Sequence, residues 1–284
     1  MISCQNSSNL FKKYLLVNGA DRPIRPILSK GLPVVMVLER HMRILSWSIN
    51  GFNKPNLPTI QSIFSSSRYD AIFFQETKTA TIPLSLSLSG YRTTLFPSKR
   101  LNYGGTLAAT KISPLSVLKG LGLEHRPEEG RVMILEFSEI YLVNAYFPFA
   151  GDKLANLDSK LKFLAKFENR IKALEARKPA VVCGDLNIAH RDIDRTFGST
   201  DMPGFSIAER AWFSRFLDSG FVDSFRFVNG DTRKYSGYWY GDKRRADRLD
   251  YALVSTSITN KIRGADIVNE VEGSDHWPIT LELT

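Results

Sequence analysis

The clearest structural signal in the chain is Ala180-Val181-Val182-Cys183-Gly184-Asp185-Leu186-Asn187. It begins as a short apolar run, which is typical of a strand buried on both faces. After Gly184 come the polar side chains of Asp185 and Asn187, two residues apart. Side chains at this spacing point the same way in an extended segment, so the pattern predicts a carboxylate and an amide side by side at a strand end. A turn capped by an Asx side chain fits the same letters equally well.

The composition is that of an ordinary soluble protein, with 43% apolar and 24% charged residues in a chain of 284. No apolar run approaches the roughly 20 residues needed to span a bilayer, so we expect no membrane partner. The two cysteines, Cys4 and Cys183, predict no disulfide framework and favour a reducing, intracellular compartment. The net charge of +9 suits a polyanionic partner.

Residues 1–41 are predicted to be a poorly ordered N-terminal extension, because they lack periodicity and are rich in Pro, Ser, Asn and Gly. They hold six Lys or Arg residues against two acidic ones, so the remaining chain is only mildly basic. The extension is either a targeting segment or a mis-assigned start ahead of Met42. A targeting segment would lead to an organelle or the nucleus; otherwise we expect the cytoplasm or nucleoid. Residues 42–284 are predicted to form one α/β domain.

Short strand-like runs alternate with amphipathic segments from Met42 onward. The longest helix is expected over residues 157–176, where apolar residues recur close to the 3.6-residue period. Two further helices are expected over residues 57–66 and 207–217, the second stopped by Gly220. Strands are expected at residues 43–49, 71–74, 91–95, 105–109, 132–137, 141–146, 180–184, 249–254 and 279–283.

Several of these strands end in polar groups of the kinds that catalytic sites use. Further such groups, beyond Asp185 and Asn187, are Asn50, Glu76, Tyr146, Asp250, Asp275 and His276. Each alone has a bland explanation, but together they supply hard oxygen ligands, a His with a carboxylate partner and neutral donors. This inventory favours metal-assisted phosphoester hydrolysis, since Mg²⁺ prefers carboxylates, waters and substrate oxygens. No Cys/His cluster indicates zinc, and no P-loop, GxGxxG or GxSxG is present.

Short motifs carry a resemblance to a known family. In chain order they are Ser46-Trp47-Ser48-Ile49-Asn50-Gly51, Gln75-Glu76-Thr77-Lys78, Tyr146-Phe147-Pro148, Gly184-Asp185-Leu186-Asn187-Ile188-Ala189-His190, Glu209-Arg210, Gly220-Phe221-Val222-Asp223-Ser224-Phe225-Arg226, Arg248-Leu249-Asp250-Tyr251 and Ser274-Asp275-His276-Trp277-Pro278. Over essentially all of residues 43–284, they resemble the exonuclease III / apurinic-apyrimidinic (AP) endonuclease family. That family is part of the endonuclease/exonuclease/phosphatase superfamily.

The resemblance implies an α/β fold, a four-layered α/β sandwich of two packed mixed sheets flanked by helices. It implies a Mg²⁺-dependent DNA-repair nuclease that acts as an AP endonuclease, a 3′–5′ exodeoxyribonuclease or both. Mn²⁺ is the expected substitute metal, duplex DNA that is damaged or offers a 3′ end is the expected partner, and a monomer is the expected state.

Carried over residue by residue, the resemblance makes Glu76 a metal ligand, with Asn50 and Asp275 close to the metal or its waters. Asp185 would activate or position the attacking water. The remaining catalytic roles fall on residues that touch the phosphate. His276, oriented by Asp250, would stabilise the phosphate or transfer a proton, and Asn187 and Tyr146 would hydrogen-bond the phosphate oxygens.

Further substrate-binding candidates are polar, basic or aromatic: Ser48, Lys78, Arg100, Tyr103, Tyr238, Trp239 and Arg245. The last three belong to residues 235–248, where aromatic rings are interleaved with cations, a composition that suits backbone contact and base stacking. A solvated hairpin that packs its rings on the domain is the alternative there. For Arg100 the alternative is a plain surface cation.

Departures from the family pattern leave the substrate open. Ser48 stands where the family usually has Asn, Phe149 where it has an Asn that touches DNA, and Asp152 where a basic residue is common. Ala246-Asp247 replaces a Gly-Trp whose Trp helps to wall the abasic pocket. Two alternatives therefore remain. One is a phosphodiesterase of the same fold acting on uracil-containing or undamaged DNA, RNA or a non-nucleic phosphoester, and the other is a non-catalytic nucleic-acid binder.

Overall fold

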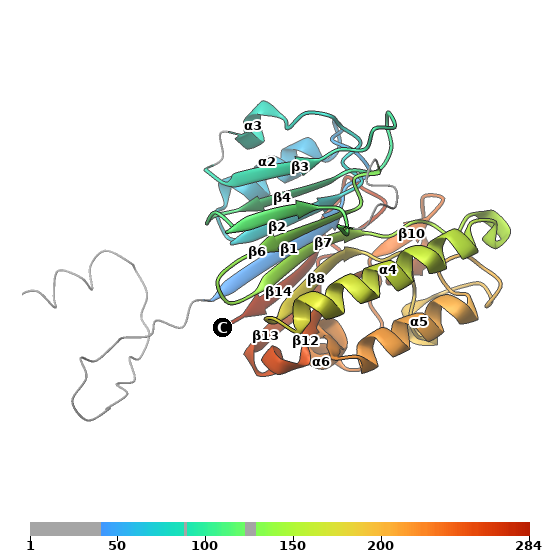
Figure 1. Ribbon diagram of the computed structural model, residues 1–284. Coiled ribbons are helices and arrows are strands. Elements are labelled where there is room, and N and C mark those ends of the chain that lie inside the picture. Colours follow the sequence, from blue (N-terminus) through green and yellow to red (C-terminus); the bar gives the residue numbers. More distant parts are fainter. Residues whose placement is uncertain (1–40, 88–89, 123–128) are drawn as a thin grey trace, which may run out of the picture. The chain divides into compact units, whose positions relative to one another are not determined.

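The computed structural model describes residues 41–87, 90–122 and 129–284 (Figure 1). Residues His41–Thr284 form one compact unit. The expectation for residues 1–41 falls, apart from His41, outside the described residues. Within the described part, no helix combines the length and the apolar character needed to cross a membrane.

Two mixed β-sheets form the centre of the unit. The strands are β1 Met42–Ser48, β2 Ala71–Gln75, β3 Arg92–Phe96, β4 Thr106–Thr110, β5 Ser116–Lys119, β6 Val132–Glu136, β7 Tyr141–Tyr146, β8 Ala180–Asp185, β9 Phe221–Asp223, β10 Gly237–Trp239, β11 Asp242–Asp247, β12 Asp250–Ser255, β13 Ile262–Ile267 and β14 Ile279–Leu283. In the described residues, the first sheet has the order β13-β14-β1-β2-β4-β3 and the second β5-β6-β7-β8-β12-β9. Strands β10 and β11 form a separate hairpin.

Helices cover the outer faces of the two sheets (Figure 1). They are α2 Leu57–Ser65, α3 Leu84–Ser87, α4 Leu157–Glu175 and α5 Ile207–Asp218. The short helix α6 Ser224–Asn229 instead places Phe225 in the core between the two sheets. Three 3-10 turns complete the elements of the described residues: η2 Asp152–Leu154, η3 Asp192–Asp194 and η4 Thr256–Lys261. Trp47 and Phe74 of the first sheet pack with Phe64 of α2. On the second sheet, Val182 packs with Phe167 of α4. The layers therefore run helix, sheet, sheet, helix, which confirms the predicted four-layered sandwich.

Strand β8 lies inside the second sheet and is buried on both faces, as its sequence predicts. Val181 and Cys183 belong to the core between the two sheets, together with Ile44 and Phe73 of the first sheet. Val182 points the other way, into the core beneath α4 and α5. Cys183 is a free, buried cysteine.

The observed elements differ from the predicted ones mainly at their ends and in charged segments. Strand β8 extends to Asp185, and β12 begins at Asp250 rather than at residue 249, because these two aspartates pair across the antiparallel strands. Strands β5, β9, β10, β11 and β13 were not expected from the sequence. They are short or carry charged residues; in β11 the run Lys243-Arg244-Arg245 hides any alternation of apolar residues.

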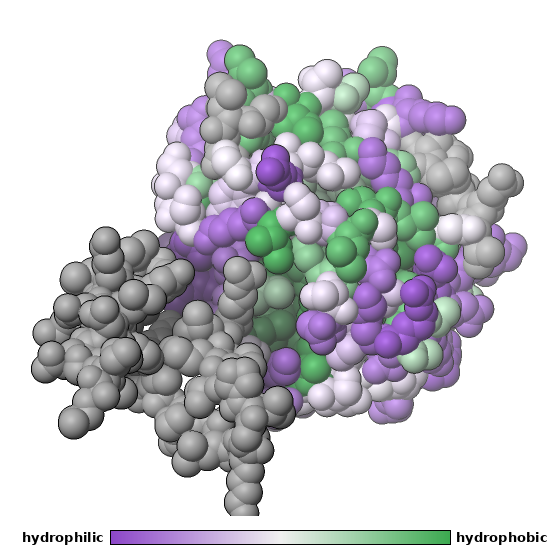
Figure 2. All heavy atoms as spheres, turned by 60° about the vertical axis from the view of Figure 1, so that its left-hand side comes forward, coloured by the Kyte–Doolittle hydropathy of each residue, from purple (hydrophilic) through white to green (hydrophobic). Residues whose placement is uncertain are grey.

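The surface seen in Figure 2 carries small hydrophobic groups among hydrophilic ones. The exposed large apolar side chains of the described residues are spread over several helices and loops, and only Phe227 and Val228 are neighbours in the chain: Leu84, Leu101, Ile112, Leu115, Ile207, Phe227, Val228 and Tyr240. The distribution of hydropathy therefore marks no functional surface. The candidate functional residues are the polar groups at the strand ends.

The parallel strand pairs bring the predicted polar groups to one edge. Strand β1 runs parallel to β2, and β7 runs parallel to β8. Since parallel strands end at the same side of a sheet, Asn50 and Glu76 follow one pair while Tyr146 and Asp185 end the other. Asp250 joins Asp185 because β12 is antiparallel and starts where β8 ends.

Gly184 allows β8 to lie close to β7 just before Asp185. A Cβ atom built at Gly184 would lie 1.8 Å from the carbonyl oxygen of Ala145, and φ at Gly184 is +147°. Both observations require a residue without a side chain. The glycine therefore permits the strand contact that places Asp185.

We expect Gly184→Ala to lower the free energy of unfolding by about 3 kcal/mol or more, because β7 or β8 must move. Urea unfolding followed by circular dichroism measures this change. Gly264→Ala on β13 is the control, since its built Cβ meets nothing nearer than 3.9 Å. Equal stability of the two variants would contradict the packing argument.

Candidate active site

Three ionisable side chains form the centre of the strand-end cluster. Nδ1 of His276 lies 2.7 Å from Oδ2 of Asp250, and its Nε2 lies 3.9 Å from Oδ2 of Asp185. One ring nitrogen of His276 and one carboxylate oxygen of each aspartate lie within 4.8 Å of one another. The indole of Trp47 donates to the backbone oxygen of His276 at 2.8 Å, which fixes the loop that carries the imidazole.

Burial and mutual charge shift the proton affinities in this cluster. Burial lowers the pKa of His276, but Asp250 and Asp185 outweigh it and hold that pKa well above its usual value. Burial raises the pKa of Asp185; His276 opposes this, while Asp250 and Glu76 add to it. These shifts favour a proton on the imidazole, with Asp250 and Asp185 as its counter-charges. Because burial raises the pKa of Asp185 to about 8, its carboxylate, once ionised, binds a proton tightly and is suited to accept one from a nucleophile.

Asp185 and Asn187 meet through a turn and not as neighbours on one extended strand. Asn187 has φ of +50°, in the left-handed region, and its backbone N–H donates to Oδ1 of Asp185 at 2.9 Å. Its Nδ2 donates to Oδ2 of Asp185 at 3.3 Å and to the carbonyl of Phe147 at 3.1 Å. The predicted proximity is present, but the extended-strand reason was wrong, because the Asx turn reverses the chain after Asp185.

Ser48 borders the same carboxylate. Its hydroxyl lies 3.5 Å from Oδ2 of Asp185, at the limit of a hydrogen bond, and its side chain is buried. Ser48, which is shorter than the Asn usual in the family, thus contacts Asp185 directly, although the hydrogen bond is weak.

A second group offers oxygen atoms to a metal: Asn50, Glu76 and Asp275. Nδ2 of Asn50 donates to Oδ1 of Asp275 at 3.2 Å. The ammonium of Lys78 lies 2.9 Å from Oε2 of Glu76 and also donates to Oδ1 of Asn50. The ammonium of Lys78 already bridges Glu76 and Asn50, so the oxygen atoms of this group can surround a positive charge. These amide and carboxylate oxygens fit a hard divalent cation.

Tyr146 links this group to a buried cation that the sequence analysis missed. Its hydroxyl donates to Oε1 of Glu76, and burial followed by the charge of Glu76 raises its pKa well above the ordinary value, so it stays a donor. The guanidinium of Arg131 lies 4.8 Å from the ring centre of Tyr146 and donates to the hydroxyl of Tyr103 at 2.7 Å. In the sequence, the only feature that could have pointed to Arg131 was its position as a charged residue directly before the apolar run of β6.

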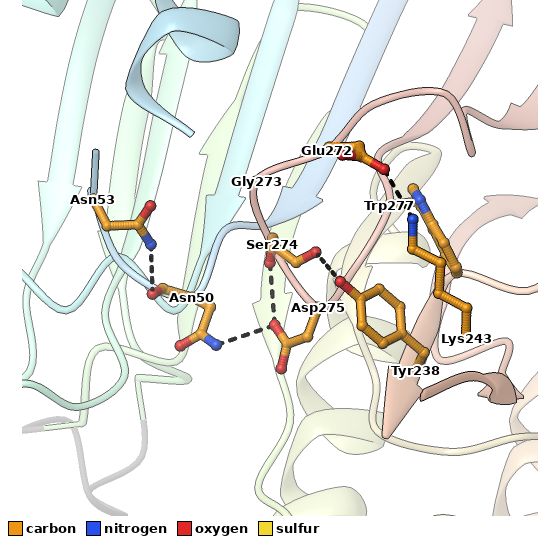
Figure 3. A pocket seen from close by; sticks show the side chains of 9 residues that line it. All are labelled: Asn50, Asn53, Tyr238, Lys243, Glu272, Gly273, Ser274, Asp275 and Trp277. Carbon is orange, nitrogen blue, oxygen red and sulfur yellow. Dashed lines mark hydrogen bonds and ion pairs between the residues drawn. The ribbon is translucent and has the colours of Figure 1, made fainter. Parts of the chain in front are cut away.

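A pocket of about 390 Å³ opens beside Asn50 and Asp275 (Figure 3). Tyr238 lines its opposite wall and donates to the backbone oxygen of Ser274 at 3.0 Å. Lys243 also lines it, with Nζ 2.9 Å from Oε1 of Glu272. The hairpin β10–β11 therefore borders the space next to the oxygen donors.

Trp239 is held by two of the residues that depart from the family pattern. Its indole N–H donates to Oδ2 of Asp247 at 2.8 Å, and its ring lies 5.8 Å from that of Phe149. Both oxygens of Asp247 accept hydrogen bonds from Arg195 at 2.9 Å. Asp247 is thus buried in a fixed ion pair and anchors an indole at this edge.

The structure brings most predicted site residues together and leaves two at the margin. Arg100 lies over the ring of Tyr103, with 4.7 Å between guanidinium carbon and ring centre. Arg245 lies over the rings of Phe197 and Tyr240, at 4.7 and 5.4 Å. These two cations flank the cluster, where contacts to a long substrate would fall.

Comparisons with known proteins place this arrangement in a family. The pattern of the Endonuclease/Exonuclease/phosphatase family matches residues 45–276. The chain is 34% identical over 248 residues to an exodeoxyribonuclease of Bacillus subtilis, covering 84% of this chain and 98% of that protein. It is also 34% identical over 283 residues to the DNA repair nuclease APEX1 of Danio rerio, covering 92% and 89%.

Solved structures agree on the fold. The 3′ phosphatase NExo from Neisseria, bound to a product DNA hairpin, superposes with a TM-score of 0.77 at 25% identity, covering 86% of this chain and 99% of that one. An AP endonuclease from Archaeoglobus fulgidus superposes with a TM-score of 0.76 at 23% identity, covering 85% and 99%. From the match of residues 45–276 and from these relatives, the chain belongs to the endonuclease/exonuclease/phosphatase family.

Proposed function

We propose that the chain is a Mg²⁺-dependent nuclease that hydrolyses phosphodiester bonds in DNA, as an AP endonuclease, a 3′–5′ exonuclease or both. The observation that carries this proposal is the contact between His276, Asp250 and Asp185 beside the oxygen donors Asn50, Glu76 and Asp275. The relatives named exodeoxyribonuclease and DNA repair nuclease support DNA as the substrate.

On one side of the phosphate, Asp185 accepts the proton of the attacking water, since its raised pKa increases its proton affinity. Asn187 offers its side-chain amide to a phosphate oxygen in exchange for one of the two bonds that it makes to Asp185 and to the carbonyl of Phe147. The Asx turn fixes the backbone that carries this amide before substrate arrives. The cationic His276, held by Asp250, stabilises negative charge that develops on the phosphate. Tyr146 stays protonated and acts as a second donor to the phosphate.

On the other side, Asn50, Glu76 and Asp275 hold the metal. When bound there, a divalent cation supplies charge stabilisation for the phosphate oxygens. Mg²⁺ suits these ligands because it takes one or two carboxylates and keeps several waters, and Mn²⁺ accepts the same oxygen atoms. Lys78, which bridges Glu76 and Asn50, would supply a further positive charge for a phosphate oxygen.

DNA reaches the site past the hairpin β10–β11. Lys243 and Arg245 on β11 supply positive charge, and Trp239 and the 81% exposed Tyr240 supply rings for stacking. The net charge of +9 adds a general attraction to a polyanion. Every group proposed for catalysis comes from one chain, so the proposed mechanism needs no second copy, and we propose a monomer.

A second candidate rests on the surroundings of Trp239. Asp247 and Phe149 hold this indole at the edge where the family's abasic pocket has other residues. Because the wall around Trp239 differs from that of the family's abasic pocket, the second candidate is a phosphodiesterase of the same fold that prefers undamaged 3′ ends over abasic sites. A panel of end-labelled duplexes with an abasic analogue, a blunt end or no lesion separates the two candidates by where each duplex is cut.

Removal of the metal should stop cleavage, because the site then lacks the cation that stabilises negative charge on the phosphate oxygens. We expect no cutting in EDTA, full activity with Mg²⁺ and activity with Mn²⁺. Glu76→Gln should raise the Mg²⁺ concentration for half-maximal rate at least about tenfold. Glu139→Gln is the control, since this exposed residue lies in the turn at the other end of β7. Undiminished cutting in EDTA would refute the metal assignment.

Asn187→Ala should lower kcat about 10²–10³-fold, because it removes a preorganised donor to the phosphate. The free energy of unfolding should fall by only about 1 kcal/mol, because Ala tolerates the left-handed φ of +50° less well than Asn, while the backbone N–H that bonds Asp185 is kept. Asn260→Ala, in exposed η4, serves as the matched control. A wild-type kcat in folded Asn187→Ala would remove Asn187 from the mechanism.

Trp239→Ala should reduce kcat/KM on duplex DNA by about tenfold, the size expected for loss of one base-stacking contact. The loss should be larger on the duplex type that the enzyme prefers, which identifies what the indole recognises. Tyr69→Ala is the control, since this ring lies before β2, away from the strand ends that carry the site. The same loss in both variants would assign Trp239 a structural role only.

A further inference from the structure

Lys160 is a completely buried cation directly behind the candidate active site. It belongs to α4, and neither its side chain nor that of Glu209 on α5 has any solvent exposure. Nζ of Lys160 lies 2.7 Å from Oε1 of Glu209 and donates to the backbone oxygen of Asn187 at 2.6 Å. One ammonium group thus joins two outer helices to the turn that follows β8.

A buried ion pair is a costly way to fill this space. Removing two charges from water carries a desolvation penalty that the mutual attraction only partly offsets, and apolar side chains of similar volume avoid it. Stability alone therefore does not explain the pair. The second contact of Lys160, to the carbonyl of Asn187, indicates a role in positioning that turn.

The left-handed turn at Asn187 has a donor fixed on its carbonyl, the ammonium of Lys160. With φ of +50°, Asn187 lies in a region that asparagine adopts more readily than most residues with a side chain. The same φ and ψ that direct its carbonyl towards Lys160 also direct its amide group towards Asp185 and the carbonyl of Phe147. A fixed donor on the carbonyl therefore fixes the amide as well.

Glu209 in turn anchors the ammonium to a rigid helix start. Its carboxylate accepts from the backbone N–H groups of Gly204 and Ser206 at 3.3 and 3.1 Å, and from the hydroxyl of Ser206 at 2.6 Å. The bond from the Ser206 N–H, together with the bond from the Glu209 backbone N–H to the Ser206 hydroxyl at 3.3 Å, forms the capping box of α5. With the anion fixed in this way, Lys160 cannot follow a movement of Asn187 away from its position.

We propose that Lys160 and Glu209 are positioning residues that set Asn187, and with it Asp185, for phosphodiester hydrolysis. This inference rests on the proposed function. Neither residue touches substrate, so loss of the pair disturbs the transition state and leaves DNA binding by the hairpin β10–β11 unchanged. A change of this kind lowers kcat and spares KM.

The test compares Lys160→Met, Lys160→Arg and wild type on the DNA substrate that the wild type cleaves. We expect Lys160→Met to lower kcat about 10–100-fold with KM within about threefold of wild type. Lys160→Arg keeps a buried donor and should recover most of the lost kcat. A merely structural lysine would show neither the kcat-specific loss nor the recovery.

Lys178→Met is the matched control. Nζ of Lys178 also contacts a carboxylate and a backbone oxygen, those of Glu136 at 2.8 Å and Phe137 at 2.9 Å. Lys178 precedes β8, at the end opposite Asp185. We therefore expect Lys178→Met to keep the kcat of the wild type.

A folded Lys160→Met with wild-type kcat, or with no greater loss than Lys178→Met, would overturn the inference. If circular dichroism shows Lys160→Met to be unfolded, Glu209→Gln carries the test, since it keeps the helix-capping oxygen but removes the charge. A kcat loss at unchanged KM in Glu209→Gln supports the pair, and a wild-type kcat refutes it. Wild-type protein that cuts no duplex would instead refute the proposed function, and the positioning role would fall with it.

Discussion

The hydrogen bond between His276 and Asp250 crosses from one sheet to the other. His276 precedes β14 of the first sheet, while Asp250 starts β12 and Asp185 ends β8 in the second. The 2.7 Å contact therefore exists only if the two sheets pack in one relative position. The apolar core between them sets that position, and Val181 and Cys183 of β8 belong to it. The apolar packing between the sheets thus determines where His276 lies relative to Asp250 and Asp185.

Buried charges around β8 and β12 limit the freedom of the site further. Arg248 has no exposed side-chain surface and lies 2.8 Å from Asp194 and 2.7 Å from Asp223. Lys160 with Glu209 repeats this pattern on the other side of β8. Such pairs add little net stability, but breaking one leaves a buried charge without its partner. They therefore favour a single arrangement of the loops over alternatives of similar packing.

Two departures from the family pattern, Phe149 and Asp247, meet at one place. They lie about 100 residues apart in the chain, yet both contact Trp239. Asp247 is balanced by Arg195, so its charge is fixed within the protein and is not presented to DNA. Ser48, another departure, lies instead beside Asp185. The departures therefore reach both the hydrolytic centre and the wall around Trp239.

Local patterns in the sequence were enough to find much of this protein. The apolar run of β8, the polar residues at strand ends and the 3.6-residue period of α4 are properties of neighbouring residues, so the α/β class and most candidate ligands could be read directly. Pairings between distant residues could not. The contact of Arg131 with Tyr146 and the burial of Lys160 against Glu209 depend on which elements pack together. A charge in a sequence shows no partner, and only the packed sheets and helices decide whether it meets solvent or another charge.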